Sequence, residues 1–406
     1  MIRILFFFLI FFLSLNASLY DEVVSQKRDT AVLKSFDIDE SFLKDKELQR
    51  VINNYKYNDS SIFIEILSSA NIYFPLIKQM LAEEGLPENL VYVAMAESGF
   101  KTRAYSIAKA VGIWQFMPTT AENFGLEVDL YVDERRDPIK STKAAMAYLK
   151  HLYGIFGKWY LAVIAYNCGE TRVIKAIKEA KSDKLEDLLK LKDNTRMQYL
   201  PAETRRYIRK IIAMSSMGQT ENLMALTGNM HLLNMGQSYP MATVTVGAGT
   251  TLKEVSESIG VDYSELKSLN AALNHGFVPP YIDKFDIYIP YDKVAVFKEN
   301  FTRKNPDEKY LVYVVKKGDT LSSIGDKYKI NRKVIQDFNK LKTASLSPNQ
   351  KLIIPIERSN DYEYVVQRGD TLNSIATKFD INVKELMDIN DKKTTINAGE
   401  KIIIQK

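Results

Sequence analysis

Cysteine and histidine are nearly absent from this chain of 406 residues, and their scarcity argues against several kinds of site. The only cysteine is Cys168, so no disulfide can form within the chain. The three histidines, His151, His231 and His275, are too widely spaced for a zinc site. No serine or cysteine has an evident histidine partner for a catalytic triad. We therefore expect no metal and no cofactor.

Long hydrophobic runs are also scarce, with one exception at the N-terminus. Arg3 is followed by an unbroken apolar run from Ile4 to Leu13 and then by small or polar residues. This run is short for a membrane span and is typical of a secretory signal peptide, which we place at residues 1–18. The alternative is an uncleaved segment that gives weak association with a membrane.

An excess of charge is likewise missing from most of the chain, whose net charge is +5. From residue 300 onward, 20 Lys and Arg stand against 14 Asp and Glu, so this stretch alone carries +6. A basic segment suits an anionic partner such as a cell wall, a membrane surface or nucleic acid, although a solvated lysine-rich surface has the same composition. The length of the chain predicts two to four domains.

The basic stretch contains an internal repeat. The segment that begins at Tyr313 recurs from Tyr364, and both copies contain Gly-Asp-Thr-Leu. In each copy a β-branched and aromatic run is followed by apolar residues at helical spacing and then by a second apolar run. We predict small α+β modules with the order strand, helix, helix, strand (βααβ) at residues 311–356 and 362–405.

A third and weaker copy of the repeat occupies residues 241–291. It contains Gly-Thr-Thr-Leu, so that Thr250 stands where the other copies have aspartate. It also carries an insertion around Asn274–Asp283. We predict the same fold for this copy and leave its ligand binding open.

The chain between the N-terminal run and the repeats has a helical pattern. We predict helices without an assigned role for residues 19–69, a densely packed helical domain for residues 70–219, and a linker for residues 220–240. Within the domain, Gly85-Leu-Pro-Glu marks the start of a helix that runs to Glu97 and ends at Gly99.

Glu97 stands at the end of this helix, where a carboxylate is poorly accommodated. Leu90 to Ala96 are apolar apart from one tyrosine hydroxyl, which indicates a buried helix. Low solvation and the negative end of the helix dipole both disfavour ionisation and raise the pKa of Glu97 toward that of a general acid. The spacing of the apolar residues alone is equally compatible with Glu97 being a surface glutamate at a frayed helix end.

Four segments, in order, resemble one enzyme family. They are Glu97-Ser-Gly-Phe, Gly112-Ile-Trp-Gln-Phe-Met-Pro-Thr, Ala165-Tyr-Asn and Glu203-Thr-Arg-Arg-Tyr. Together they resemble the catalytic domain of the soluble lytic transglycosylases, which has a goose-type-lysozyme-like fold. The repeats resemble LysM domains, which bind glycans that contain N-acetylglucosamine. The resemblance implies a multidomain protein, with a mainly α catalytic domain followed by LysM modules.

This resemblance implies a role for each matching residue. Glu97 is the sole catalytic acid and base, and the substrate-binding residues around it are Ser98, Gln115, Met117, Tyr166, Asn167, Glu203 and Tyr207. We interpret Trp114 as a core residue rather than a sugar platform, and residues 133–138 as charged groups that pin a loop. The glycan-binding candidates of the repeats are Gly318, Asp319, Thr320, Gly369, Asp370 and Thr371.

The implied reaction cleaves peptidoglycan between N-acetylmuramic acid (MurNAc) and N-acetylglucosamine (GlcNAc) without water and leaves 1,6-anhydro ends. The resemblance also implies a bacterial protein that is secreted across the inner membrane to the periplasm or cell envelope, with peptidoglycan rather than nucleic acid as partner. Two alternatives stay open. One is a muramidase that uses water on the same fold, and the other is an inactive scaffold that only binds the wall.

Overall fold

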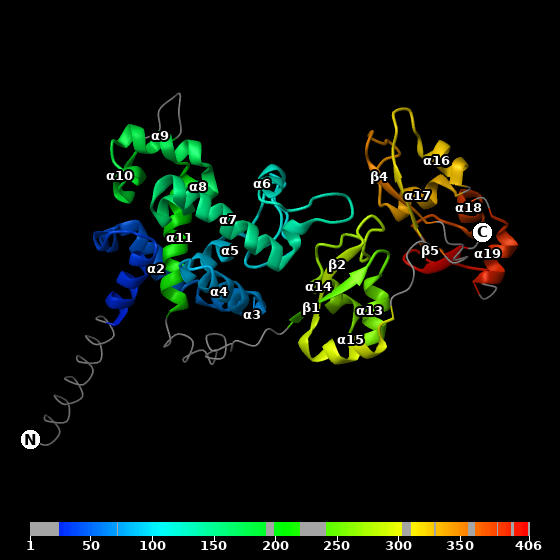
Figure 1. Cartoon of the computed structure of the whole chain (residues 1–406), viewed down its shortest axis with the longest axis horizontal. Helices are drawn as coiled ribbons and strands as arrows, with labels where there is room; N and C mark the ends of the chain where they lie inside the picture. Colours follow the sequence, from blue (N-terminus) through cyan, green and yellow to red (C-terminus); the bar gives the residue numbers. More distant parts are fainter. Residues whose placement is uncertain are drawn as a thin grey trace, which may run out of the picture. The chain divides into compact units, whose positions relative to one another are not determined.

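The computed structural model describes residues 24–70, 72–191, 199–219, 241–302, 310–328, 330–355, 362–379, 381–390 and 394–404. The predicted signal peptide and linker lie outside these residues. The chain divides into two units (Figure 1). The first unit consists of Met1–Asp129 and Asp133–Pro240, and the second consists of Leu130–Val132 and Met241–Lys406. Each unit is described by itself.

The first unit is helical, as predicted. Residues 24–35 form its first described helix. The α-helices that follow are α2 (Lys46–Tyr57), α3 (Ser60–Ser69), α4 (Tyr73–Glu83), α5 (Val91–Ser98), α6 (Pro118–Asn123), α7 (Pro138–Phe156), α8 (Trp159–Cys168), α9 (Glu170–Ala180), α10 (Leu185–Lys190) and α11 (Ala202–Gly218). Short 3₁₀ helices include η1 (Glu40–Lys44), η2 (Glu88–Leu90) and η3 (Glu134–Arg136).

Helix α7 shows how local sequence sets the ends of an element. The carboxylate of Asp137 accepts hydrogen bonds from the backbone N–H groups of Ile139 (2.9 Å) and Lys140 (2.8 Å), and Pro138 occupies the first turn. Gly157, with φ of 67°, ends the helix in the left-handed region. The N-terminus of α7 is therefore fixed directly after the charged segment 133–137.

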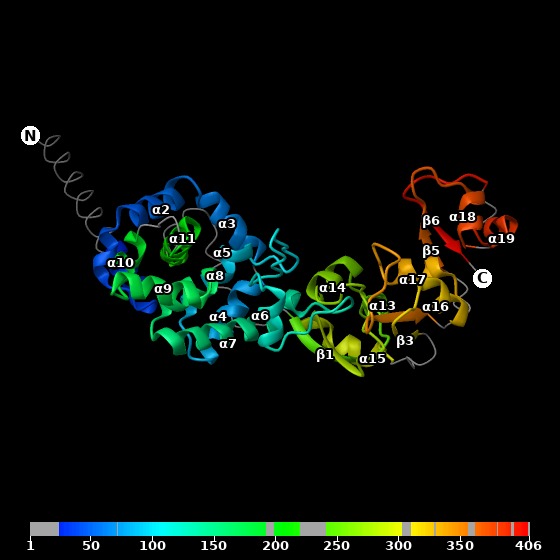
Figure 2. The same cartoon turned by 90° about the horizontal axis from the view of Figure 1, so that it is seen from above.

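Helix α11 forms the centre of the first unit. It packs against α2, α5 and α8, and Figure 2 shows it nearly end-on among them. Its fully buried side chains include Ile208, Ile211 and Ile212. Because α5 carries Glu97 and α11 carries Tyr207, this packing brings together two residues that are 110 positions apart.

The N-terminal segment, for which the sequence predicted helices but no role, is part of this helical unit. Arg209 on α11 donates two hydrogen bonds to the carboxylate of Asp45, at 2.9 and 2.8 Å. The backbone N–H of Tyr160 donates to the carbonyl of Phe36 at 3.0 Å. These contacts show that residues before position 70 help to position α8 and α11.

No single helix among the described residues is long and apolar enough to cross a membrane. Helices α3 and α4 reach the required length only as a pair, and they are bent by 78° relative to each other.

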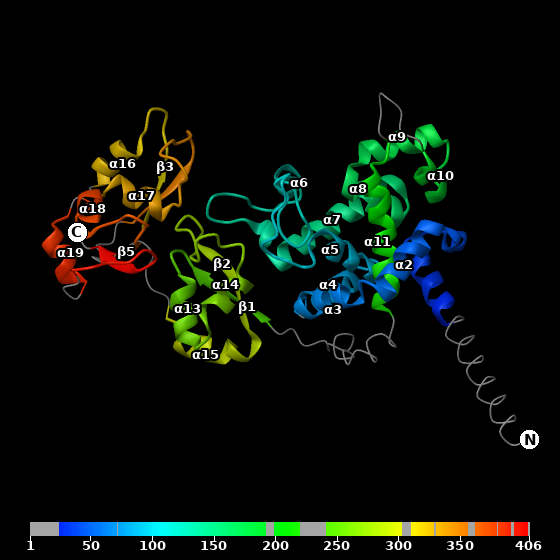
Figure 3. The same cartoon turned by 180° about the vertical axis from the view of Figure 1, so that it is seen from behind.

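The second unit contains three βααβ modules, which confirms the predicted fold (Figure 3). In each module two antiparallel strands pair and two helices connect them. The elements are β1 (Met241–Gly247), α13 (Leu252–Ile259), α14 (Tyr263–Leu269) and β2 (Lys284–Pro290), then β3 (Tyr310–Val314), α16 (Leu321–Tyr328), α17 (Arg332–Phe338) and β4 (Lys351–Pro355), then β5 (Tyr362–Val365), α18 (Leu372–Phe379), α19 (Val383–Ile389) and β6 (Lys401–Ile404).

The repeated asparagine of the modules has a structural role. The side-chain amide of Asn339 donates to the carbonyls of Ile335 (2.7 Å) and Ile353 (2.9 Å), and its oxygen accepts from the N–H of Ile353 at 2.9 Å. Asn270 and Asn390 make the equivalent three bonds in their own modules. One side chain thus joins the second helix to the closing strand, and the weaker copy retains it.

Among the described residues, the first module continues into further helix after its closing strand. Helix α15 (Val294–Asn300) follows β2, and its Phe297 belongs to the same hydrophobic cluster as Val255 of α13. The folded module therefore extends past residue 291, where the repeat pattern ends.

Candidate active site

Glu97 lies in the last turn of α5, and the helix ends at Gly99 as the sequence predicted. The five residues from Val91 to Met95 are all buried, so the helix is anchored in the core on every side. Gly99, with φ of 60°, ends the helix, and its N–H donates to the carbonyl of Met95 at 3.0 Å. Glu97 itself is half-buried, so its carboxyl is held at a fixed place with limited access to water.

The hydroxyl of Tyr207 donates a hydrogen bond of 2.6 Å to Glu97 Oε1. Burial raises the pKa of Glu97 to about 7, while the Tyr207 hydrogen bond and the positive charge of Lys210 oppose this rise and the charge of Glu203 adds to it. Burial and the neighbouring Glu97 hold the pKa of Tyr207 well above its usual value. Near neutral pH, both the protonated and the ionised form of Glu97 are therefore accessible.

Lys210 is a component of the site that the sequence did not single out. It follows Tyr207 by three positions on α11, so the two side chains share a face of the helix. Its Nζ donates to the carbonyl of Ala96, directly before Glu97, at 3.3 Å. Burial lowers the pKa of Lys210, and the charge of Glu97 opposes this shift. The spacing from Tyr207 was the one signal in the sequence that could have revealed it.

Ser98 and Tyr166 contact the backbone of the turn at residues 112–116. The Ser98 hydroxyl donates to the carbonyl of Ile113 at 2.8 Å, and the Tyr166 hydroxyl donates to the carbonyl of Trp114 at 2.8 Å. Tyr166 also lies close enough to Glu97 for the charge of Glu97 to contribute to its raised pKa. Both side chains thus fix the turn beside the acid.

Gln115 stands in this turn with φ of 49°, in the left-handed region that a non-glycine residue rarely adopts. Its side-chain amide donates to the carbonyl of Gly112 at 2.9 Å. Met117 follows, with 43% of its surface exposed, at the start of α6. Trp114 is fully buried and donates from Nε1 to the hydroxyl of Thr142 at 2.9 Å, so its interpretation as a core residue is confirmed.

The two remaining candidates differ in their surroundings. Asn167, at the end of α8, accepts a hydrogen bond of 2.7 Å from the hydroxyl of Thr204 on α11. Glu203 is exposed in the first turn of α11, and its negative charge contributes to the raised pKa of Glu97. Among the described residues, no group of three or more His, Cys, Asp or Glu side chains could hold a metal ion.

The Gly-Asp-Thr-Leu segments of the second and third modules form exposed turns. Asp319 accepts hydrogen bonds from the Tyr313 hydroxyl and the Lys316 N–H, both at 2.7 Å. Asp370 accepts from Tyr364 (2.6 Å) and the Gln367 N–H (2.7 Å) in the same way. Thr320 and Thr371 cap the following helices through Ser323 and Ser374, and Gly318 and Gly369 have φ of 94° and 93°. These side chains shape the turn, and most residues of the turn are exposed to solvent.

The corresponding turn of the first module is covered. The N–H of Gly249 donates to the carbonyl of Val278 at 2.9 Å, and the N–H of Val278 donates to the carbonyl of Thr250 at 2.8 Å. Val278 belongs to the insertion that distinguishes this copy, and Thr250 is only 8% exposed. The insertion therefore occupies the surface that the other two modules leave open.

Comparison with known proteins matches the helical unit and the βααβ modules to separate families of domains. The family model described as Transglycosylase SLT domain matches residues 74–189, and LysM domain matches residues 313–355 and 364–405. The model of the lytic transglycosylase MltD LysM-like domain matches residues 240–305. Over 380 residues the chain is 30% identical to membrane-bound lytic murein transglycosylase D of Escherichia coli, which covers 88% of this chain and 80% of that protein. The chain belongs to this family of lytic transglycosylases.

Other similarities of this transglycosylase cover less of the chain. The cell wall-binding protein YocH of Bacillus subtilis is 34% identical over 93 residues, or 22% of this chain and 32% of that protein. The crystal structure of the soluble lytic transglycosylase Slt70 from E. coli matches 41% of this chain and 26% of that chain, with 21% identity and a TM-score of 0.30. The match to the SLT domain ends at residue 189, so Tyr207 and Lys210 lie beyond it.

Proposed function

We propose that this protein cleaves the β-1,4 bond between MurNAc and GlcNAc in peptidoglycan without water, with Glu97 as the only catalytic acid and base. The observation that carries the proposal is the half-buried carboxyl of Glu97, whose pKa is raised to about 7 by burial and which accepts a hydrogen bond from Tyr207. A carboxyl of this pKa can both give and take a proton near neutral pH.

In the first step, protonated Glu97 gives its proton to the glycosidic oxygen. The bond from that oxygen to C1 of MurNAc breaks, the GlcNAc fragment leaves with a free hydroxyl, and positive charge develops on the MurNAc ring. Tyr207 donates to Oε1 of Glu97 and thereby stabilises the carboxylate that remains.

In the second step, the Glu97 carboxylate takes the proton of the C6 hydroxyl of the same MurNAc. The C6 oxygen forms a bond to C1, which yields a 1,6-anhydro ring and restores protonated Glu97. No water is consumed, and the nucleophile comes from the substrate, so the reaction needs no second carboxylate. Lys210 supplies a positive charge near Glu97 while Glu97 is ionised.

The neighbouring side chains would hold the glycan in the orientation that these steps require. Gln115 belongs to the turn that Ser98 and Tyr166 fix, and Met117 follows this turn directly before α6. Asn167 and Glu203 lie at the junction of α8 and α11. Preorganised contacts of this kind lower the barrier by fixing the reacting atoms close together.

We propose that the LysM modules bind the glycan strands of the wall and that the protein acts in the periplasm of the bacterial cell envelope. We assign binding to the exposed turns with Gly318, Asp319 and Thr320 and with Gly369, Asp370 and Thr371. The first module would have a structural role instead, because its turn is covered by the insertion.

Mass analysis of the fragments released from purified sacculi tests the reaction. Anhydro ends are lighter by one water than hydrolytic ends and cannot be reduced by borohydride. Reducible fragments that carry oxygen from labelled water would identify a muramidase instead, with Glu203 as the first carboxylate to examine. A folded protein that binds sacculi but releases nothing would be an inactive scaffold.

A further inference from the structure

Arg135 forms a buried ion pair next to the turn that carries Gln115. Its Nε and Nη2 donate to the two carboxylate oxygens of Asp133 at 2.8 and 2.9 Å. Arg135 is 6% exposed and Asp133 is 4% exposed. The carboxylate thus fixes the plane of the guanidinium through two parallel bonds.

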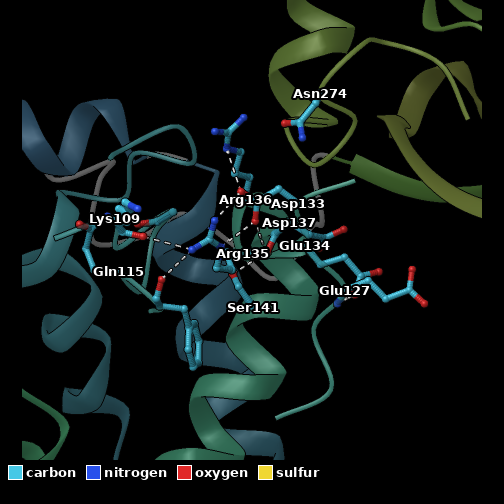
Figure 4. Close-up of polar contacts among 12 residues, drawn as sticks. Lys109, Gln115, Glu127, Asp133, Glu134, Arg135, Arg136, Asp137, Ser141 and Asn274 are labelled. Atoms are coloured by element: carbon cyan, nitrogen blue, oxygen red, sulfur yellow. Dashed lines mark hydrogen bonds and ion pairs between the residues drawn. The ribbon is translucent and has the colours of Figure 1, made fainter. Parts of the chain in front are cut away.

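The remaining nitrogen of the guanidinium binds the backbone on both sides of the turn. Arg135 Nη1 donates to the carbonyl of Lys109 at 3.2 Å and to the carbonyl of Phe116 at 3.3 Å. Figure 4 shows the guanidinium between Asp133 and the segment that carries Lys109 and Gln115. One side chain therefore joins Lys109, which precedes the turn, to Phe116, the residue that follows Gln115.

The backbone of Arg135 also lies against this turn. Gly112 has φ of 83°, and a Cβ at this position would lie 1.8 Å from the carbonyl oxygen of Arg135. Only glycine fits between the two segments. Together with the bonds from Ser98 to Ile113 and from Tyr166 to Trp114, this contact fixes the turn from three different elements.

We propose that Arg135 is a positioning residue for the reaction, which holds the turn at residues 112–116, together with the segment 109–111 before it, in the conformation that presents Gln115 to the glycan at Glu97. This inference rests on the proposed function of the site. The backbone of Gln115 lies in the left-handed region, a conformation that the surrounding structure must stabilise. The guanidinium of Arg135 stabilises it through charge-assisted hydrogen bonds to the carbonyls of Lys109 and Phe116, on either side of Gln115. Lysine cannot replace it, because an ammonium lacks the planar fork that binds Asp133 and both carbonyls at once.

The test compares Arg135→Lys with Arg28→Lys in the full chain. Arg28 pairs with Asp29 through Nε and Nη2, both at 2.9 Å, in the helix at residues 24–35, so it controls for the loss of one ion pair. On solubilised glycan strands we expect kcat of Arg135→Lys to fall about tenfold or more, since a small misplacement of a substrate contact is costly, with KM changed much less. Arg28→Lys should retain wild-type kcat and KM. Equal losses of stability with unchanged kcat in both variants would overturn the proposal.

A double-mutant cycle with Gln115→Ala tests whether Arg135 acts through the turn. If it does, Arg135→Lys should reduce kcat far less in the Gln115→Ala protein than in the wild type. Fold-changes that multiply would show that Arg135 acts independently of Gln115, contrary to the proposal. Asp133→Asn removes the charge that orients Arg135 and should behave as Arg135→Lys does. It replaces Arg135→Lys in these measurements if the lysine variant fails to fold.

A spectroscopic measurement separates this inference from the proposed reaction. Trp114 lies in the turn, and Trp159 is the only other tryptophan of the chain. In a Trp159→Phe background, acrylamide quenching of Trp114 fluorescence should rise about twofold or more in Arg135→Lys and stay unchanged in Arg28→Lys. If the products prove to be hydrolytic, the reaction assignment fails while this result stands; equal quenching in the two variants would refute the positioning role itself.

Discussion

The Tyr207 hydroxyl lies 2.6 Å from Glu97 Oε1, so a donor near the start of α11 contacts the carboxyl at the end of α5. Tyr207 is nearly fully buried, and the two helices pack directly against each other. The contact therefore has a fixed geometry. A donor to one carboxylate oxygen leaves the other oxygen to exchange a proton with the substrate, which suits a single residue that acts first as acid and then as base.

Tyr207→Phe should reduce kcat about tenfold, because a hydrogen bond to a charged group is lost when Glu97 is ionised. The bond opposes the rise in the pKa of Glu97, so its loss should also move the alkaline limb of the pH–activity profile to higher pH. Tyr160→Phe is the control, since its buried hydroxyl donates to the carbonyl of Asp183 and not to Glu97. An unchanged profile in Tyr207→Phe would contradict the role given to this bond.

Lys210→Met should likewise move the alkaline limb of the profile to higher pH. The lysine charge lowers the pKa of Glu97, so its removal leaves burial and the charge of Glu203 less opposed. Lys210→Arg retains the charge and should keep the wild-type profile. A shift toward lower pH, or the same shift in both variants, would show that Lys210 acts by packing rather than by its charge.

The local pattern of the sequence predicted much of this fold. The second module has the predicted order of strand, helix, helix and strand, with its second helix at Arg332–Phe338 and its closing strand at Lys351–Pro355. The end of α5 was predictable because glycine at position 99 stops a helix that is otherwise apolar. Patterns of this kind depend on neighbours in the chain, which the sequence displays directly.

The partners of Glu97 could not be derived from local pattern. Tyr207 entered the prediction only through the family resemblance, and Lys210 did not enter it, because the contact depends on how α11 packs against α5. Ser98 and Tyr166 were predicted as substrate-binding residues, and that role stays a prediction, but their hydroxyls donate to backbone carbonyls. The direction in which a hydroxyl donates depends on tertiary structure and leaves no periodic signal.

Glu97→Gln should reduce the rate of glycan cleavage by a factor of about 10² to 10⁴, the usual contribution of a general acid. Binding to sacculi should be retained. Its effect on stability should depend on pH. The pKa of Glu97 is raised from 4.5 to about 7 in the folded protein, so folding favours the protonated form, and the ionised form destabilises the fold as the pH rises through this range. Glutamine stays neutral and avoids this penalty.

Thermal unfolding at two pH values measures this effect. At pH 8 we expect the melting temperature of Glu97→Gln to exceed that of the wild type by several degrees, since each kcal/mol of the removed penalty shifts it by about 2–4 °C in a domain of this size. At pH 5 the difference should be much smaller. An equal difference at both pH values would mean that the pKa of Glu97 is not raised by folding.

The last prediction concerns the exposed turns of the second and third modules. Asp319→Ala removes the acceptor for Tyr313 and for the Lys316 N–H, and Asp370→Ala does the same in the third module, so each change should loosen one turn. Each single variant should co-sediment less well with sacculi. The double variant should lose about tenfold or more in apparent affinity, because two linked sites raise each other's effective concentration.

Asp286→Ala is the matched control for this prediction. Asp286 also accepts a hydrogen bond from a side chain, that of Thr245 at 2.6 Å, but it lies on the strands of the first module, whose turn is covered. It removes the same charge and should leave sedimentation unchanged. All four variants should cleave solubilised strands at the wild-type rate, since Glu97 and its partners are untouched. If Asp286→Ala weakens sedimentation as much as Asp319→Ala, the wall is held by general surface charge and not by the two exposed turns.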